Sequence, residues 1–107
     1  MVEFADEEVK KWIKDFKEKV ISKYSPERIL LFGSRARGDN LKESDIDIII
    51  ISDKFEGIKW PNRIADVAEL WDGLIAIEPL CYTSKEFRTK KKQLGIVRKA
   101  VEEGIRV

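Results

Sequence analysis

The sequence predicts an α/β (α+β) fold, in which a small mixed β-sheet of three or four strands is flanked by helices. Short apolar runs bounded by turn residues alternate with segments whose apolar residues recur at helical spacing, and this pattern is typical of such a fold. Of the 107 residues, 43% are hydrophobic, which is enough for one core. A chain of this length fits a single domain, residues 1–107, which should bury roughly 60–65% of its unfolded surface.

The first helix is expected to begin at Asp6, a favourable N-cap residue. Apolar residues then recur every three or four positions, on one face of the helix: Val9, Trp12, Ile13, Phe16 and Val20. The turn Ser25-Pro26-Glu27 ends this helix. The short apolar run at residues 29–32 then predicts a buried strand, and a second strand is expected at residues 45–51.

The next helix begins near Pro61, which suits a first helical turn because that turn leaves its N–H groups unpaired. Its apolar residues follow an amphipathic stripe: Trp60, Ile64, Val67, Ala68 and Trp71. Both tryptophans are expected to pack in the core. The pair Asp72-Gly73 closes this helix.

A third strand is expected at residues 74–82, where Pro79 indicates an edge strand or a bulge. Thr83 and Glu86 have the spacing of a capping box, so another helix should begin near Ser84. A last short helix is expected from apolar residues at helical spacing near the end of the chain: Leu94, Val97 and Val101.

Two aspartates open the second strand. Asp45 and Asp47 are two residues apart, and such residues project from the same face of a strand. Adjacent carboxylates repel each other unless a cation lies between them, and hard oxygen ligands suit Mg²⁺. The pair therefore predicts a metal site.

A turn suited to phosphate follows the first strand. Gly33 lets the backbone turn sharply and approach a ligand closely. Ser34 adds a hydroxyl and an N–H where a short helix could begin, and a helix start attracts anions. Arg35 and Arg37 come next, and at least one is expected to contact phosphate, because a guanidinium donates in a planar fork. Together with the aspartates, this turn predicts a site for a metal–nucleotide complex.

The segment Gly33-Ser34-Arg35-Ala36-Arg37-Gly38, followed by Ser44-Asp45-Ile46-Asp47, resembles the G-S-x10-D-x-D signature of the DNA polymerase beta-like nucleotidyltransferase superfamily. Its length and its G-S-R-A-R-G form are most similar to the minimal nucleotidyltransferases of prokaryotes, and the resemblance covers residues 4 to 90. The resemblance implies a nucleotidyltransferase fold and a transfer of AMP from ATP to a hydroxyl acceptor, with two Mg²⁺ ions.

The resemblance also implies roles for individual residues. Gly33 and Ser34 would hold the β- and γ-phosphates, while Asp45 and Asp47 would coordinate Mg²⁺. Such a transfer uses a third carboxylate to complete the second metal site or to activate the acceptor, and Glu78 is the candidate. Similar proteins usually have Asp at the matching point, and this departure bears on the strength of catalysis rather than on nucleotide binding. The alternative for Glu78 is a solvated carboxylate on an edge strand.

The composition excludes several other chemistries. The chain has no histidine, which rules out Ser-His, Cys-His and histidine–metal sites. The one cysteine, Cys81, cannot form an internal disulfide and is expected to be a small buried hydrophobe. No apolar run approaches the ~20 residues that span a bilayer, and the N-terminus has no signal-peptide pattern. A cytoplasmic protein without a membrane partner is therefore expected.

Residues 85–99 carry seven basic side chains and one acidic side chain, that of Glu86. Such a patch can bind an acidic partner or nucleic acid, but a solvated helix face in a charge-rich chain is the favoured interpretation. The formal net charge is only +1, and only Tyr82 and Phe87 lie near as aromatic residues. Nucleic acid binding is therefore not favoured.

The expected partners follow from the resemblance as well. Minimal nucleotidyltransferases are often paired with a small helical protein of the HEPN type, an RNase toxin, and some add AMP to a tyrosine of that toxin. The resemblance thus implies an antitoxin whose substrates are a nucleoside triphosphate and a partner protein. Two alternatives stay open: a non-catalytic antitoxin or scaffold that acts by binding, and an ordinary α/β binding domain. An antibiotic or RNA acceptor is a less favoured variant, and oligomer formation is open.

Overall fold

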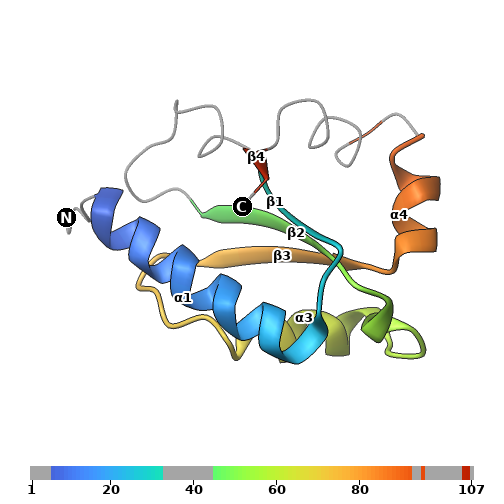
Figure 1. The fold of residues 1–107 in the computed structure, drawn as a ribbon, viewed down its shortest axis with the longest axis horizontal. Helices are drawn as coiled ribbons and strands as arrows, with labels where there is room; N and C mark the ends of the chain where they lie inside the picture. Colours follow the sequence, from blue (N-terminus) through green and yellow to red (C-terminus); the bar gives the residue numbers. More distant parts are fainter. Residues whose placement is uncertain (1–5, 33–44, 93–94, 96–104, 107) are drawn as a thin grey trace.

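The structure, a computed structural model, describes residues 6–32, 45–92, 95 and 105–106 (Figure 1). Helices and strands follow one another in this order: α1 (Asp6–Tyr24), β1 (Arg28–Phe32), β2 (Ile46–Ile51), the short 3-10 helix η1 (Asp53–Phe55), α3 (Trp60–Ala68), β3 (Ile77–Tyr82), α4 (Ser84–Lys90) and β4 (Ile105–Arg106). This arrangement confirms the predicted α/β class. The predicted last helix lies outside the described residues.

The four strands form one mixed sheet in the order β3-β2-β1-β4. Strand β1 is antiparallel to both β2 and β4, whereas β2 and β3 are parallel and are connected through α3. Because β2 and β3 run in the same direction, their first residues lie side by side at one end of the sheet. Their last residues, Ile51 and Tyr82, are paired at the other end, where α4 follows.

Both faces of β2 are buried, which explains its uninterrupted run of isoleucines. Ile48 and Ile50 belong to a core cluster with residues of α1 and α3, such as Phe16 and Val67. Ile49 and Ile51 face the opposite side. There they pack in a second cluster with residues of β1, β3 and α4: Leu30, Phe32, Tyr82 and Phe87. Figure 1 shows α1 and α3 on the same side of the sheet, with α4 standing at its end.

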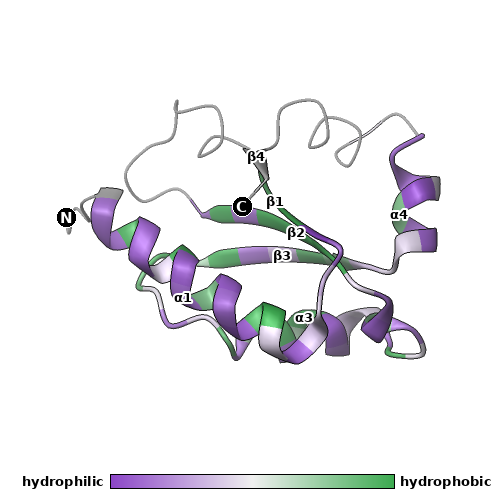
Figure 2. Ribbon diagram, in the orientation of Figure 1, coloured by the Kyte–Doolittle hydropathy of each residue, from purple (hydrophilic) through white to green (hydrophobic). Residues whose placement is uncertain are grey.

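Helix α1 buries one face and exposes the other, as the alternating colours along it in Figure 2 show. Val9, Phe16 and Val20 are buried, whereas the lysines and glutamates between them lie mostly outward. The helix ends at Tyr24. The next residue, Ser25, has a left-handed φ of 44°, and its N–H donates to the Ile21 carbonyl at 3.0 Å. The predicted turn is thereby confirmed.

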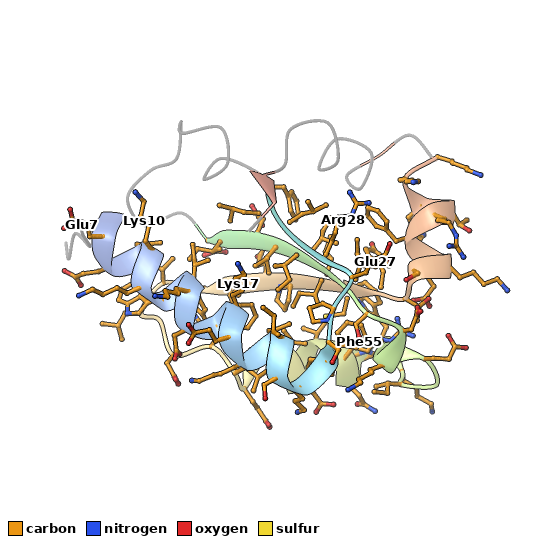
Figure 3. All side chains as sticks on the ribbon, in the orientation of Figure 1. Glu7, Lys10, Lys17, Glu27, Arg28 and Phe55 are labelled. Atoms are coloured by element: carbon orange, nitrogen blue, oxygen red, sulfur yellow. The ribbon has the colours of Figure 1, made fainter. Side chains whose placement is uncertain are left out.

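Helix α4 is docked against the start of β1. The Ser84 hydroxyl donates to Glu27 at 2.6 Å, and the guanidinium of Arg28 lies 5.4 Å from the centre of the Phe87 ring. Figure 3 labels Glu27 and Arg28 beside this helix. Thr83 and Glu86 form the predicted capping box, with both of its hydrogen bonds present. The same figure labels Phe55 of η1, which is fully buried.

Three expectations need correction. The third strand begins at Ile77 rather than at residue 74, and the Leu74 side chain is 74% exposed. Trp60 is not a core residue, because 38% of it is exposed. In α3 the buried residues are Val67 and Arg63, while Ala68 lies at the surface. The predicted apolar stripe is wrong at both ends of the helix, because only the residues between them reach the core, where Val67 packs against the isoleucines of β2.

Other expectations hold. Pro79 lies in an edge strand, where its missing N–H costs no ladder hydrogen bond. Trp71 packs partly buried against Phe16, with 5.6 Å between the ring centres. Cys81 is fully buried, and burial raises the pKa of its thiol to about 12. No helix within the described ranges is long and apolar enough to cross a membrane.

Candidate functional site

Asp47 and Glu78 are direct neighbours on the parallel strands β2 and β3. Neighbouring strands lie about 4.8 Å apart, so side chains at paired positions on the same face can touch. Asp45 immediately precedes β2 and shares a face with Asp47, since the two are separated by one residue. The sheet therefore places Glu78 beside the two aspartates, from which it is separated by about 30 residues of sequence.

These carboxylates lie on the sheet face that α1 and α3 do not cover. Ile46 and Ile48 face the helices, so the alternation along a strand turns Asp47 to the other side. There Asp47 is half-buried, while Asp45 and Glu78 are exposed. On its other side, Asp47 is paired with Phe32, the last residue of β1, and Gly33 is the next residue of the chain.

Both aspartates influence the ionisation of Glu78. A side-chain hydrogen bond with Asp47 is the largest cause that raises the pKa of Glu78, followed by burial and by the negative charges of Asp47 and Asp45. A smaller part of the rise comes from a side-chain hydrogen bond with Asp45. Ionised carboxylates at neighbouring positions repel one another, and a bound cation would relieve that repulsion.

The donor set fits a divalent cation by its chemistry. Asp45, Asp47 and Glu78 offer only carboxylate oxygens, the ligands that Mg²⁺ prefers, and they lie at an edge that solvent can reach. Within the residues that the structure describes, no three such side chains are already arranged around a common metal position. The fit therefore rests on the type of ligand and on the neighbouring positions of the three residues at the starts of β2 and β3.

The other predicted site residues are not among those described. Gly33, Ser34, Arg35 and Arg37 all lie in the range 33–44, outside the described part of the chain. Their assignment to nucleotide binding stays a prediction from the sequence.

One structurally central residue was missed by the sequence reasoning. Arg63 is only 6% exposed, and its guanidinium donates to the carbonyl oxygens of Ile58 at 2.7 Å and Cys81 at 3.1 Å. It also donates to both carboxylate oxygens of Glu86, at 2.7 and 3.3 Å. The one sequence feature that could have identified Arg63 is a charged residue at a position of the predicted helix that faces the sheet. Arg63 holds the free edge of β3, the strand that carries Glu78.

Comparison with known sequences places this chain in a family. A family model described as "Nucleotidyltransferase domain" matches residues 13–107. Two relatives from Methanocaldococcus jannaschii are each named "Putative protein adenylyltransferase". One is 36% identical over 74 residues, which make up 65% of this chain and 75% of the relative. The other is 30% identical over 99 residues, or 92% of both chains.

Comparison with solved structures shows the fold. The crystal structure of a "putative nucleotidyltransferase" from Sulfolobus solfataricus matches with a TM-score of 0.59 and 24% identity, covering 92% of this chain and 84% of that one. BolA1 from Arabidopsis thaliana matches with a TM-score of 0.56 and 22% identity, over 68% of this chain and 92% of BolA1. Proteins with different names share this fold, so the fold alone does not identify the reaction. The match to the family model identifies the type of enzyme. Since that model covers nearly the whole sequence, the chain belongs to the nucleotidyltransferase domain family and is an enzyme of this type.

Proposed function

We propose that this protein transfers AMP from ATP to a hydroxyl group of a partner protein, in a reaction that requires Mg²⁺. The observation that carries the proposal is the pairing of Asp47 with Glu78 on neighbouring strands, with Asp45 immediately before β2. The names of the Methanocaldococcus relatives support a protein as the acceptor and an adenylyl group as the cargo.

Each carboxylate has a proposed part in the transfer. Asp45 and Asp47 would hold Mg²⁺ together with the triphosphate, and Glu78 would complete the site for a second ion. Bound Mg²⁺ would supply positive charge to the phosphate oxygens. The acceptor oxygen forms a bond to the α-phosphorus while the bond to the β-phosphate oxygen breaks and pyrophosphate leaves. Glu78 would also take the hydroxyl proton of the acceptor.

The segment after β1 would bind the rest of the nucleotide. Gly33 and Ser34 would donate backbone N–H groups and a hydroxyl to the β- and γ-phosphates. Arg35 or Arg37 would contact the triphosphate or the acceptor. This part of the proposal is supported by the sequence signature, and by the pairing of Phe32, which precedes Gly33, with Asp47.

The finer proposal concerns the partner. A small helical protein of the HEPN type would be the acceptor, and the nucleotidyltransferase would act as its antitoxin. The support for this pairing is the resemblance to minimal nucleotidyltransferases. The relatives' names agree with a protein acceptor but name no partner.

Label transfer tests the proposal. The wild type, Asp47→Asn and Asp66→Asn would each be incubated with a lysate of the native host and with ATP labelled at either the α- or the γ-phosphate. We expect label from α-labelled ATP alone to enter a protease-sensitive, RNase-resistant product. Asp47→Asn should reduce this transfer by about 100-fold or more, because a metal ligand is lost.

Asp66→Asn is the matched control, because Asp66 belongs to α3, on the other side of the sheet. It should transfer like the wild type. Label entering from the γ-phosphate would show phosphoryl transfer instead, and an RNase-sensitive product would show an RNA acceptor. Unchanged transfer by Asp47→Asn would show that the site is wrongly assigned.

A further inference from the structure

Trp60 is a large aromatic residue that the fold leaves at the surface. It begins α3 and is 38% exposed, yet its ring centre lies 5.1 Å from that of Tyr82, with 47° between the ring planes. Behind Tyr82, the Phe87 ring follows at 6.5 Å and is buried. Trp60 is thus the outer member of an aromatic layer whose inner members belong to the core.

A cavity of about 230 Å³ lies against this layer, lined by Trp60, Tyr82, Glu86 and Lys90. The Glu86 carboxylate is already paired, because both of its oxygens accept hydrogen bonds from Arg63. The Arg63 hydrogen bond is also the largest cause that lowers the pKa of Glu86. The charge that remains for a ligand is the ammonium of Lys90. The cavity therefore combines an aromatic wall with a net positive charge.

A second hollow of about 470 Å³ lies along α4 and is lined by Lys85, Arg88, Thr89 and Lys92. All four of these residues are exposed. From Ser84 to Lys92 the chain carries five basic residues and one acidic residue, Glu86, which Arg63 neutralises. Basic side chains therefore lie along the whole length of α4, and one of them, Lys90, lines the aromatic cavity.

This surface is separate from the carboxylate cluster. Glu78 lies near the start of β3 and Tyr82 at its end. Four residues of strand span about 13 Å. Figure 1 shows the same separation, with α4 at the far end of the sheet from the starts of β2 and β3. A ligand at α4 would not occupy the transfer site.

We propose that the α4 surface, defined as Trp60, Tyr82, Lys85, Arg88, Lys90 and Lys92, binds single-stranded nucleic acid. One base stacks on Trp60 in the cavity, and the phosphates on either side of it contact the basic residues of α4. Aromatic stacking combined with a basic groove is how proteins hold single strands without reading their sequence. An acidic peptide would use the lysines and Arg88 but would leave the indole without a matching group, so nucleic acid is favoured.

The sequence alone argued against this reading, because no aromatic residues alternate with the basic ones. The fold supplies the missing aromatic residue from a distant segment, since Trp60 of α3 lies beside Tyr82 of β3. The inference is independent of the proposed adenylyl transfer and would hold for an inactive transferase as well.

Fluorescence anisotropy with a labelled single-stranded oligouridylate of about 12 nucleotides tests the proposal. The variants are Trp60→Leu, Trp60→Phe and the double variant Arg88→Ala/Lys92→Ala, each checked for its fold by circular dichroism. We expect Trp60→Leu to weaken binding by about 5- to 150-fold and Trp60→Phe to restore most of it, because the loss is one stacked base. The double variant should lower the slope of log affinity against log salt by about 1.4.

The matched control is Lys11→Ala/Lys14→Ala, which removes the same charge from exposed positions of α1. It should bind like the wild type. Equal weakening by this control would show non-specific attraction to the whole protein and overturn the proposal. Unchanged binding by Trp60→Leu would overturn it too, as would a wild type that binds polyglutamate but no oligouridylate, since that would make α4 a site for acidic proteins.

Discussion

Arg63 shows at the residue scale how a buried charge can organise a sheet edge. Within the described part of the chain, β3 is the last strand on its side of the sheet, and no strand pairs with the carbonyl groups on its outer side. The Arg63 guanidinium takes the place of a partner strand, because it donates to the Cys81 carbonyl. It also donates to Glu86, which caps α4. One side chain therefore connects α3, β3 and α4.

Replacing Arg63 with methionine tests this role. The variant removes the Arg63 hydrogen bonds to the Cys81 carbonyl and the Glu86 carboxylate. We expect the free energy of unfolding to fall by roughly 3 kcal/mol, which is the low end for a buried pair, because Glu86 is partly exposed and keeps its bond from Thr83. Chemical denaturation measures the change. Arg88→Met makes the same substitution at an exposed position and should change stability by less than about 0.5 kcal/mol. Equal stability of the two variants would contradict the assigned role.

The ion pair of Arg63 and Glu86 also gives stability a pH dependence. The hydrogen bond from Arg63 lowers the pKa of Glu86 below its usual value of 4.5. A carboxylate with a lowered pKa stabilises the fold above its unfolded pKa, and this contribution is lost as the pH falls through the folded pKa. We therefore expect the wild type to be more stable than Glu86→Gln at pH 7 and the two to converge below pH 4.5. A difference that stays constant over this range would refute this linkage.

At the scale of elements, the sequence predicted what local patterns determine. The isoleucine run of β2, the capping box of α4 and the edge position of Pro79 all follow from residue types and short spacings. The pairing of Asp47 with Glu78 could not be predicted in this way, because it depends on strand order and register between segments about 30 residues apart. The sequence identified the three carboxylates, and the sheet brought them together.

The failures at this scale have physical reasons as well. Ile75 is buried against Val9 but does not belong to a strand. The prediction relied on apolar character alone and therefore started the third strand too early. The Trp71 indole N–H donates to the Ile75 carbonyl at 2.8 Å and holds this turn outside the sheet. Trp60 fitted the helical period, but it begins α3 and packs against Tyr82 while 38% of it stays exposed.

The junction of α1 and β2 offers a test at the element scale. Ser52 follows β2 and is 2% exposed, and its hydroxyl donates at 2.5 Å to the carbonyl of Tyr24, the last residue of α1. Ser52→Ala leaves that carbonyl without its donor, so we expect a loss of about 1–3 kcal/mol in the free energy of unfolding. Ser22→Ala on the exposed face of α1 is the control and should be nearly neutral. Thermal denaturation that finds both variants equally stable would rule out this link.

For the whole molecule, the parallel strands β2 and β3 separate two surfaces. Their first residues carry the carboxylate cluster, and their last residues lead to α4 and its aromatic cavity. Both ends rest on the core that β2 forms with its neighbours on either face.

The central claim is that Asp45, Asp47 and Glu78 form a metal-dependent nucleotide site. Isothermal titration calorimetry of ATP into the wild type, Asp47→Asn and Asp66→Asn, each with Mg²⁺ and with EDTA, tests it most directly. We expect binding with Mg²⁺ but not with EDTA for the wild type and Asp66→Asn, and an affinity at least about tenfold weaker for Asp47→Asn, since a charged ligand is lost. Equal binding by Asp47→Asn, or wild-type binding that does not respond to Mg²⁺, would contradict the claim.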